Sequence, residues 1–171
     1  MQILAPRREN LHVIDDDGLV RRAVVADAPA VTELVAAAYA KYLARMPFRP
    51  RPMDADYAAV LGATDSWVVE LDGRISGVLV CMLEPDHLLV ENVAVHPDAQ
   101  GRGLGGRLLE LAEQHAAVNG REEVRLYTNE VMVENLRLYA RRGYVETGRE
   151  SRDGFGRVFL AKRLISPPSP G

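Results

Sequence analysis

The stretch from Gln100 to Arg107, QGRGLGGR, restricts the fold of this chain more than any other feature of its sequence. It follows an apolar run typical of a strand and opens a segment with helical periodicity, so its glycines lie at a strand-to-helix turn. Glycine lets a backbone approach a ligand closely, and the free N–H groups of a helix's first turn hold negative charge. Because three glycines in one helical turn cost stability without a structural gain, a ligand-binding turn is favoured over a simple helix cap.

Two phosphate-binding patterns fit this stretch. Gly101, Gly103 and Gly106 satisfy G-x-G-x-x-G, the pattern of a dinucleotide-binding turn. That turn needs its first glycine at the strand end and an acidic residue that closes the following strand. Here the segment HPDAQ separates the strand from Gly101, and the acidic pair after the helix opens the next strand instead of closing it. The alternative pattern, Q-x-x-G-x-G read from Gln100, is therefore favoured over a nicotinamide or flavin site.

Length and composition are those of a single globular domain. The chain has 171 residues, of which 47% are hydrophobic and 26% charged, enough to bury a core without disulfides or metals. Its net charge is −3 with both signs dispersed, which argues against a nucleic-acid partner. The N-terminal segment lacks the apolar run of a signal peptide, and no later run approaches membrane-spanning length. We therefore expect a cytoplasmic protein without a membrane partner.

Cysteine and histidine usage predicts no metal site. Cys81 is the only cysteine, which excludes an internal disulfide and a multi-cysteine zinc site, and its apolar surroundings predict a buried, inert thiol. No two of the four histidines have the spacing of metal ligands.

The predicted elements give one domain between two tails. We expect an N-terminal tail over residues 1–17, a domain over 18–165 and a disordered Pro/Ser-rich tail over 166–171. Strands are predicted over 19–25, 66–73, 74–84, 87–97, 123–129, 144–151 and 156–164. Helices are predicted over 27–43, 54–62, 103–119 and 131–143, with Asp27 and Asp54 as N-caps of the first two. This order predicts an α/β (α+β) fold: a single mixed, mostly antiparallel sheet with helices on both faces.

The glycine-rich turn resembles the phosphate-binding motif of the GNAT acetyltransferase superfamily. The residues that carry the resemblance are Gln100, Gly103 and Gly105, which follow the strand LLVENVAVHP. The likeness extends in element order from Leu19 to Leu164, with both tails outside it.

A second motif supports the same resemblance. In many family members the helix after the fifth strand reads N-x-x-A-x-x-x-Y-x-x-x-G-[FY]. The corresponding positions of this chain hold Met132, Asn135, Tyr139, Gly143 and Tyr144. The tyrosine and the glycine–aromatic pair match, whereas the usual asparagine and alanine are replaced. Because Asn135 lies one turn before Tyr139 on the same helical face, we expect it to take the place of the missing asparagine in cofactor binding.

The resemblance implies an acyl-CoA N-acyltransferase fold and acetyl-CoA as the acyl donor. In the family, the cofactor lies where two strands splay apart, here 87–97 and 123–129, and its pantetheine arm pairs with the backbone of the first of them. The acetyl group then passes to the primary amine of a small molecule or peptide by direct attack. The residues implied to bind the cofactor are Val93, Ala94, Val95, Gln100, Gly101, Arg102, Gly103, Leu104, Gly105, Gly106, Asn135 and Tyr139.

This chemistry implies an acid, a base and an oxyanion donor. Tyr139 is the candidate acid for the leaving thiolate, because a phenol has a pKa of about 10. Glu91 is the candidate base, since strand alternation puts it on the face of Val93 and Val95 inside an apolar run. The oxyanion donor is expected to be a backbone N–H near Val93 to Val95, where the family carries a β-bulge.

The acceptor is left open by the sequence. In the family, the first two helices and their connection line the acceptor cleft, which here points to Tyr39, Tyr42, Arg45 and Tyr57. Mixed charges and aromatic rings suit a small amine with an acidic or aromatic group, and they equally suit a peptide N-terminus or a lysine. A non-catalytic acyl-CoA-binding module on the same fold is the alternative function, and homodimers are common in the family.

Overall fold

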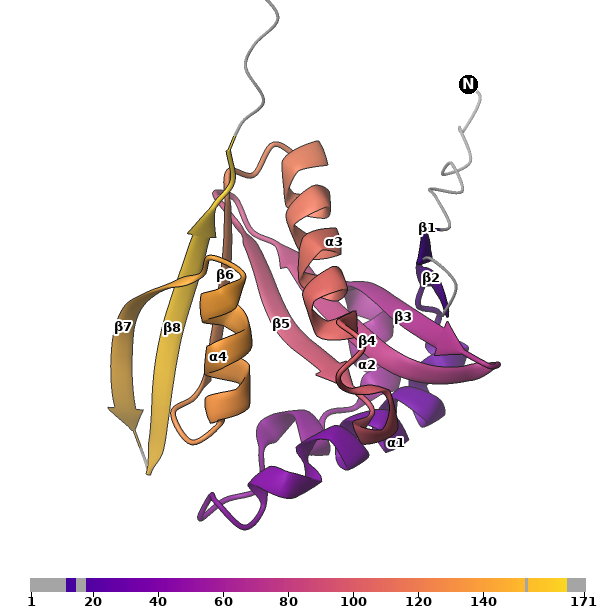
Figure 1. Ribbon diagram of the computed structural model, residues 1–171, viewed down its shortest axis with the longest axis horizontal. Coiled ribbons are helices and arrows are strands. Elements are labelled where there is room, and N and C mark those ends of the chain that lie inside the picture. Colours follow the sequence, from indigo (N-terminus) through magenta and orange to yellow (C-terminus); the bar gives the residue numbers. More distant parts are fainter. Residues whose placement is uncertain (1–11, 15–17, 153, 166–171) are drawn as a thin grey trace, which may run out of the picture.

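The computed structural model describes residues 12–14, 18–152 and 154–165, which form an eight-stranded sheet with helices on both faces (Figure 1). The strands are β1 (His12–Ile14), β2 (Gly18–Arg22), β3 (Asp65–Leu71), β4 (Arg74–Leu83), β5 (Leu88–Val95), β6 (Glu123–Asn129), β7 (Val145–Arg152) and β8 (Phe155–Arg163). Their order in the sheet is β1-β2-β3-β4-β5-β6-β8-β7. Among these described strands, β5 and β6 form the one parallel pair, so the predicted mixed, mostly antiparallel sheet is confirmed.

Within the described residues, four α-helices and four short 3₁₀ turns connect the strands. The α-helices are α1 (Ala28–Tyr39), α2 (Tyr57–Ala63), α3 (Leu104–Val118) and α4 (Val133–Arg141). The turns are η1 (Val25–Asp27), η2 (Ala40–Tyr42), η3 (Arg51–Asp54) and η4 (Pro97–Ala99). Thus every predicted helix and strand is present.

The sheet begins earlier than the sequence predicts. The three residues of β1 pair in antiparallel fashion with β2, although they lie within the segment expected to be a tail. A strand of three residues is too short to show a hydrophobic periodicity of its own. Its formation depends instead on pairing with the edge of β2. The rest of the predicted tails, residues 1–11, 15–17 and 166–171, lies outside the described part of the chain.

Alternating side chains of β4 separate two apolar cores. Leu79 and Cys81 belong to the core beneath α3 and α4, whereas Val78 and Val80 belong to the core beneath α1 and α2. This alternation is the normal consequence of the strand pleat, and it buries both faces of the central sheet. Burial also raises the pKa of the Cys81 thiol, in agreement with the inert cysteine predicted from the sequence.

The neighbouring strands β5 and β6 run together for only three residues and then separate. The parallel ladder joins Leu88–Val90 to Val124–Leu126. Beyond it, β5 stays paired with β4 as far as Val95, and β6 stays paired with β8 as far as Asn129. The sheet therefore splits into two halves, and Figure 1 shows the two strands diverging from the end at which they are paired.

A β-bulge in β5 coincides with this separation. Val90 pairs with Cys81 of β4 and Asn92 pairs with Val80, so Glu91 is an extra residue without a partner on β4. A bulge bends its strand and increases the local twist. It thereby turns the rest of β5 away from β6.

Asp27 stands at the predicted N-cap position of α1, but its carboxylate makes no cap hydrogen bond to the helix. A partly buried ion pair and the turn η1 engage this carboxylate instead. Arg21 donates to both carboxylate oxygens of Asp27 at 2.8 Å and to Glu70 Oε1 at 2.8 Å. The Val24 N–H donates to Asp27 Oδ2 at 2.8 Å.

The start of α2 also differs from the prediction. Asp56 caps this helix by accepting from the Ala59 N–H at 3.3 Å, whereas Asp54 was the predicted cap. Because η3 takes up Asp54, the helix begins two residues later, and Asp54 instead accepts from Arg49 Nε at 2.6 Å.

We predict that Asp27→Asn lowers the free energy of unfolding by about 1–3 kcal/mol at pH 7, because Arg21 loses one of its two charged partners and keeps only Glu70. The Arg21 guanidinium holds the pKa of Asp27 below its ordinary value, so the folded protein keeps this carboxylate charged at lower pH than the unfolded chain does. The stabilisation is therefore complete above about pH 4 and is lost as the pH falls through the lowered pKa. The difference in the free energy of unfolding between wild type and variant should therefore shrink at low pH. Denaturant titrations of both proteins between pH 3 and pH 8 measure it.

The matched control for this prediction is Asp54→Asn. Both side chains of the Arg49–Asp54 pair are more than half exposed, at 51% and 61%, and such surface pairs contribute about 0–1 kcal/mol. Equal losses in the two variants, or a loss for Asp27→Asn that is independent of pH, would contradict the role assigned to the buried pair.

Candidate functional site

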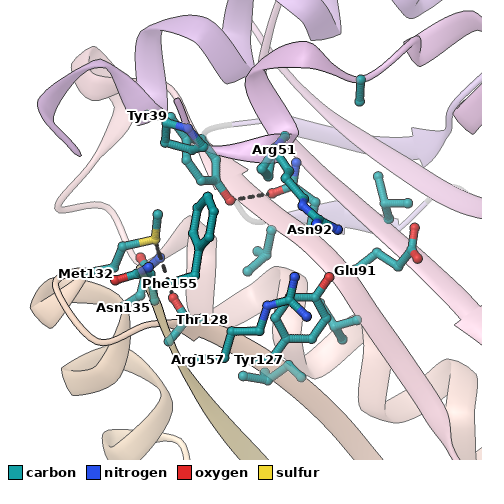
Figure 2. A pocket seen from close by; sticks show the side chains of 18 of the residues that line it. Tyr39, Arg51, Glu91, Asn92, Tyr127, Thr128, Met132, Asn135, Phe155 and Arg157 are labelled. Carbon is teal, nitrogen blue, oxygen red and sulfur yellow. Dashed lines mark hydrogen bonds between the residues drawn. The ribbon is translucent and has the colours of Figure 1, made fainter. Parts of the chain in front are cut away.

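The split between β5 and β6 opens into a cavity of about 230 Å³, which we call the split cavity (Figure 2). Val90–Val93 of β5 lie on one side of it and Leu126–Asn129 of β6 on the other. Its remaining walls come from α1, α4, the start of β8 and the segment between Met46 and Val60. The cavity therefore lies in the gap that the diverging strands create.

A chain of hydrogen bonds builds one wall of the split cavity. Tyr39 Oη donates to Asn92 Oδ1 at 2.9 Å, and Asn92 Nδ2 donates to Tyr57 Oη at 3.2 Å. Tyr57 Oη donates in turn to the Pro52 carbonyl oxygen at 2.7 Å. Burial raises the pKa of Tyr57 to about 12 and also raises that of Tyr39, so both hydroxyls remain protonated donors. This chain fixes α1, α2 and η3 on β5.

The opposite wall of the split cavity is more apolar. Thr128 Oγ1 donates to the Met132 sulfur at 3.4 Å, and Figure 2 shows this pair facing the ring of Phe155. Phe155 stacks on Phe48 with ring centroids 5.0 Å apart. The stack joins the segment before η3 to the start of β8, so the wall is held from both halves of the sheet.

A second cavity of about 560 Å³, which we call the turn cavity, lies at the N-terminus of α3. Val93–Val95 of β5 line one side, the glycine-rich turn lines the next, and residues of α1, η2 and α4 complete it. Gln100 Nε2 donates to the Val95 carbonyl oxygen at 3.2 Å. The glutamine side chain thereby fastens the turn to the end of β5.

Glycine is required at two positions of this turn. Gly101 and Gly103 have φ angles of +83° and +78°, and no atom lies within 4 Å of the position that a Cβ would take. Their backbone conformation, and not a shortage of space, therefore selects glycine. Gly103 is the N-cap of α3, whose first-turn N–H groups have no acceptor within the helix and border the turn cavity.

Three cations line the turn cavity: Lys41, Arg141 and Arg142. Arg142 Nη1 donates to Glu110 Oε1 at 2.5 Å. A Cβ at Gly106 would come within 1.8 Å of this guanidinium, so the glycine lets the arginine lie against the first turn of α3. The sequence does not predict these cations, because α3, α4 and η2 come together only in the fold.

The two cavities meet at Tyr39, Val93 and Asn135, which line both of them. Beside this junction, Tyr42 Oη donates to Asn135 Oδ1 at 3.4 Å. Two nitrogens of Arg45 donate to the carboxylate of Glu134 at 2.8 Å, which lowers the pKa of Glu134 to about 2. These contacts join η2 and the residues after it to the start of α4, across the gap between the two halves of the sheet.

Tyr139 lies on α4 and is 5% exposed, with its side chain lining the split cavity. Burial, and to a smaller extent Tyr42, raises the pKa of its phenol, which therefore carries its proton at neutral pH.

Glu91 lies at the bulge and is exposed. The expectation that strand alternation puts it on the face of Val93 and Val95 is wrong, because the extra residue interrupts the alternation. Val90, and not Glu91, packs with Val93 and Val95 in the core beneath α3. Glu91 lines the edge of the split cavity, and Figure 2 shows its carboxylate directed away from the centre.

The residues expected to bind a cofactor are brought together with two exceptions. Arg102 is exposed and is not among the residues that line the turn cavity, and Tyr139 lines only the split cavity. The residues that do line the turn cavity are Val93, Ala94, Val95, Gln100, Gly101, Gly103, Leu104, Gly105, Gly106 and Asn135.

The four residues expected to bind the acceptor are divided between different places. Tyr39 and Tyr57 line the split cavity, whereas Tyr42 lines the turn cavity. Arg45 lines neither and is engaged by Glu134.

Neither a metal centre nor a membrane segment was found in the part of the chain that the structure describes. No three His, Cys, Asp or Glu residues of that part are grouped so that they could hold a metal ion. Likewise, none of its helices has the length and apolar character needed to cross a membrane.

Comparison with known proteins identifies the same family as the motifs. Residues 62–146 match the model of the acetyltransferase (GNAT) domain. The ribosomal-protein-S18-alanine N-acetyltransferase from Escherichia coli shares the fold with a TM-score of 0.71 and 18% identity, over 90% of this chain and 99% of that chain. PaiA N-acetyltransferase from Thermoplasma acidophilum, in complex with coenzyme A, has a TM-score of 0.70 and 12% identity over 85% and 98% of the two chains.

A GNAT family acetyltransferase from Elizabethkingia anophelis with acetyl-CoA bound has a TM-score of 0.65 and 17% identity, over 88% of this chain and 100% of that chain. A search of curated proteins gave no match to this sequence. The domain match, the shared fold and the glycine-rich turn at the start of α3 lead to one conclusion: the chain is a member of the GNAT acetyltransferase superfamily.

Proposed function

We propose that this protein is an acetyl-CoA-dependent N-acetyltransferase that acts on the primary amine of a small molecule or peptide. The observation that carries the proposal is the meeting of the two cavities at Tyr39, Val93 and Asn135. A direct transfer requires both substrates at one point in a fixed orientation. A donor held in the turn cavity and an amine held in the split cavity fulfil that requirement.

The turn cavity suits the phosphates of acetyl-CoA. Free N–H groups at the start of α3 and the cations Lys41, Arg141 and Arg142 border it, and both kinds of donor favour phosphate oxygens. Arg102, at the exposed turn, is a further candidate contact. The acetyl-CoA bound to the relative from Elizabethkingia anophelis supports the same donor for this chain.

The free edge of β5 suits the pantetheine arm. The ladder to β6 ends at Val90, so none of the described strands pairs with Val93–Val95 on that side. An extended ligand with amide groups can pair with such an edge as an added strand does. This path leads from the turn cavity to the junction with the split cavity.

Acetyl-CoA supplies an acetyl group activated as a thioester. Transfer to an amine forms an N–C bond and breaks the C–S bond, so the ammonium must lose a proton and the leaving sulfur must gain one. We assign the first step to Glu91 and the second to Tyr139. Backbone N–H groups at the bulge and along Val93–Val95 are the candidate donors for the charge on the thioester oxygen.

Two observations support these roles. Glu91 is the one carboxylate among the described residues that line the split cavity. Tyr39 and Tyr57 already use their hydroxyls in the chain through Asn92, whereas the Tyr139 hydroxyl has no hydrogen-bond partner among the described residues. A protonated phenol that has no acceptor within the protein can donate its proton to a bound ligand.

The first test is a thermal-shift panel with acetyl-CoA, CoA, NAD and FAD. A ligand at about 100 times its Kd adds about 2.7 kcal/mol, which corresponds to a rise in Tm of about 5–10 °C for a chain of this size. We expect this rise with both CoA species and none with the dinucleotides. Arg142→Gln should reduce the rise more than Arg102→Gln does, since only Arg142 lines the turn cavity. A rise with NAD or FAD alone would reject the proposed donor.

Tyr139→Phe should lower kcat by about tenfold or more, since general acid catalysis contributes about 10²–10⁴-fold. The Tm rise with acetyl-CoA should remain, because the hydroxyl takes part in the reaction and not in phosphate binding. Tyr144→Phe is the matched control: it removes a buried hydroxyl from the same region, bound to Glu113, that lines neither cavity. Unchanged turnover in Tyr139→Phe would exclude the acid role.

Glu91→Gln tests the base. A side chain that accepts the proton of the ammonium contributes to turnover, so the variant should lose at least about tenfold in kcat/KM. Glu122→Gln, an exposed glutamate outside both cavities, is the control. An unchanged kcat/KM in Glu91→Gln would show that the amine is deprotonated in another way.

Binding of acetyl-CoA without transfer to any amine would support the alternative, a non-catalytic acyl-CoA-binding module. The thermal-shift panel measures the binding of acetyl-CoA, and the kinetic variants measure turnover. Together they distinguish the transferase from the binding module.

A further inference from the structure

We infer that the acceptor is a free amino acid with an apolar or aromatic side chain, and that Arg51 and Arg157 bind its carboxylate. This inference rests on the proposed N-acetyltransferase function and narrows its acceptor, which the sequence leaves open between small molecules and peptides.

The charges at the split cavity favour an anionic ligand. The charged residues that line it are Arg51, Arg157 and Glu91, so cations are in excess. Within the described part of the chain, no carboxylate forms an ion pair with either arginine. Their N–H donors are therefore available to a carboxylate, which a guanidinium binds through two parallel hydrogen bonds.

The other arginines of the same connection behave differently. Arg45 is paired with Glu134 at 2.8 Å, and Arg49 is paired with Asp54 at 2.6 Å. Both of these side chains are engaged by the protein itself and line neither cavity. Arg51 thus stands apart from its neighbours, since it is the one of the three that lines a cavity.

Arg157 is held in position by an aromatic ring. Its guanidinium lies over Tyr127 with 5.2 Å between the guanidinium carbon and the ring centroid, and the side chain is half-buried. Such stacking fixes the plane of the guanidinium and leaves its N–H edge free. In Figure 2, Arg157 comes from β8 and Arg51 from η3, and the two side chains extend toward the same side of the cavity from opposite walls.

The rest of the cavity suits an apolar body. Tyr39, Tyr57, Leu126, Met132 and Phe155 line it, and the charges of the described lining residues are confined to the two arginines and Glu91. A carboxylate turned toward the apolar walls would be desolvated without a partner, which is costly. The carboxylate is therefore directed to the arginines, and the side chain to the rings and methionine.

The two arginines also disfavour a peptide acceptor. In a peptide, the carboxyl group next to the terminal amine is an uncharged amide, so the two arginines would face a group that cannot form an ion pair. A free amino acid keeps this charge, and its amine lies only two bonds from the carboxyl carbon. Amine and carboxylate can thus face the junction and the arginines at the same time.

The test compares L-phenylalanine with three probes that differ at the carboxylate: phenethylamine, L-phenylalaninamide and the α-aminophosphonate analogue. We expect kcat/KM to be at least about tenfold higher for the amino acid than for phenethylamine or the amide, which both lack the carboxylate. This factor is in keeping with charge-assisted hydrogen bonds. The amide serves as the mimic of a peptide N-terminus. Equal or higher kcat/KM with phenethylamine or the amide, or a preference for the phosphonate, would overturn the inference.

Arg51→Gln and Arg157→Gln should each reduce the ratio of kcat/KM for phenylalanine over phenethylamine by about 10- to 100-fold. Arg49→Gln is the matched control, because this arginine lies in the same connection and is engaged by Asp54 outside the cavity. A ratio that is unchanged in both cavity variants would contradict the inference.

Calorimetry on the CoA-loaded protein separates this inference from the proposed function. Phenylalanine should bind to the wild type and to Arg49→Gln at least about tenfold more tightly than to Arg51→Gln or Arg157→Gln. That result without turnover would uphold the binding site while rejecting the transferase function. Turnover of amines with no dependence on these arginines would uphold the transferase function and reject the site.

Discussion

The separation of β5 from β6 after three paired residues is the constraint on which the rest of this structure depends. Unpaired backbone groups inside a sheet are normally costly, and a split is tolerated only where water or a ligand can satisfy them. The bulge at Glu91 bends β5 away while β6 keeps its full ladder with β8. One local irregularity thereby creates both the free edge of Val93–Val95 and the gap occupied by the split cavity.

A split sheet needs contacts that hold its halves at a fixed distance, because small displacements of reacting groups cost rate. The separate cores beneath α1 and α3 cannot provide them alone, since the gap lies between the halves. The Arg45–Glu134 pair and the Tyr42–Asn135 hydrogen bond cross it on one side, and the Phe48–Phe155 stack crosses it on another. The exposed ion pair adds little to stability. What it contributes is position, since it fixes η2 against the start of α4 beside the junction of the cavities.

The sequence predicts the order of elements, the mixed sheet and the turn at Gly103, because periodicity and turn chemistry are local properties. It misses features that depend on pairing between distant segments. The position of the bulge is one: the family resemblance implies a bulge near Val93 to Val95, whereas the register against β4 puts it at Glu91 and thereby changes the face on which Glu91 lies. The cation Arg142 is another, because only the packing of α4 on α3 brings it to Gly106. Asp54 resembles a cap locally, but it lies in η3 and pairs with Arg49, and Asp56 caps α2 instead. Asp27 does stand at the N-cap of α1, but its carboxylate is engaged by Arg21.

The charged residues that stabilise the fold differ from those that line the two cavities. The chain as a whole carries a net charge of −3, yet cations outnumber carboxylates among the residues that line each cavity. Arginines that support the fold, such as Arg21, are engaged by carboxylates of the protein, whereas Arg51 and Arg157 keep their donors for the split cavity. The excess of cations at each cavity favours anionic ligands at these two sites, although the chain as a whole has a small net negative charge.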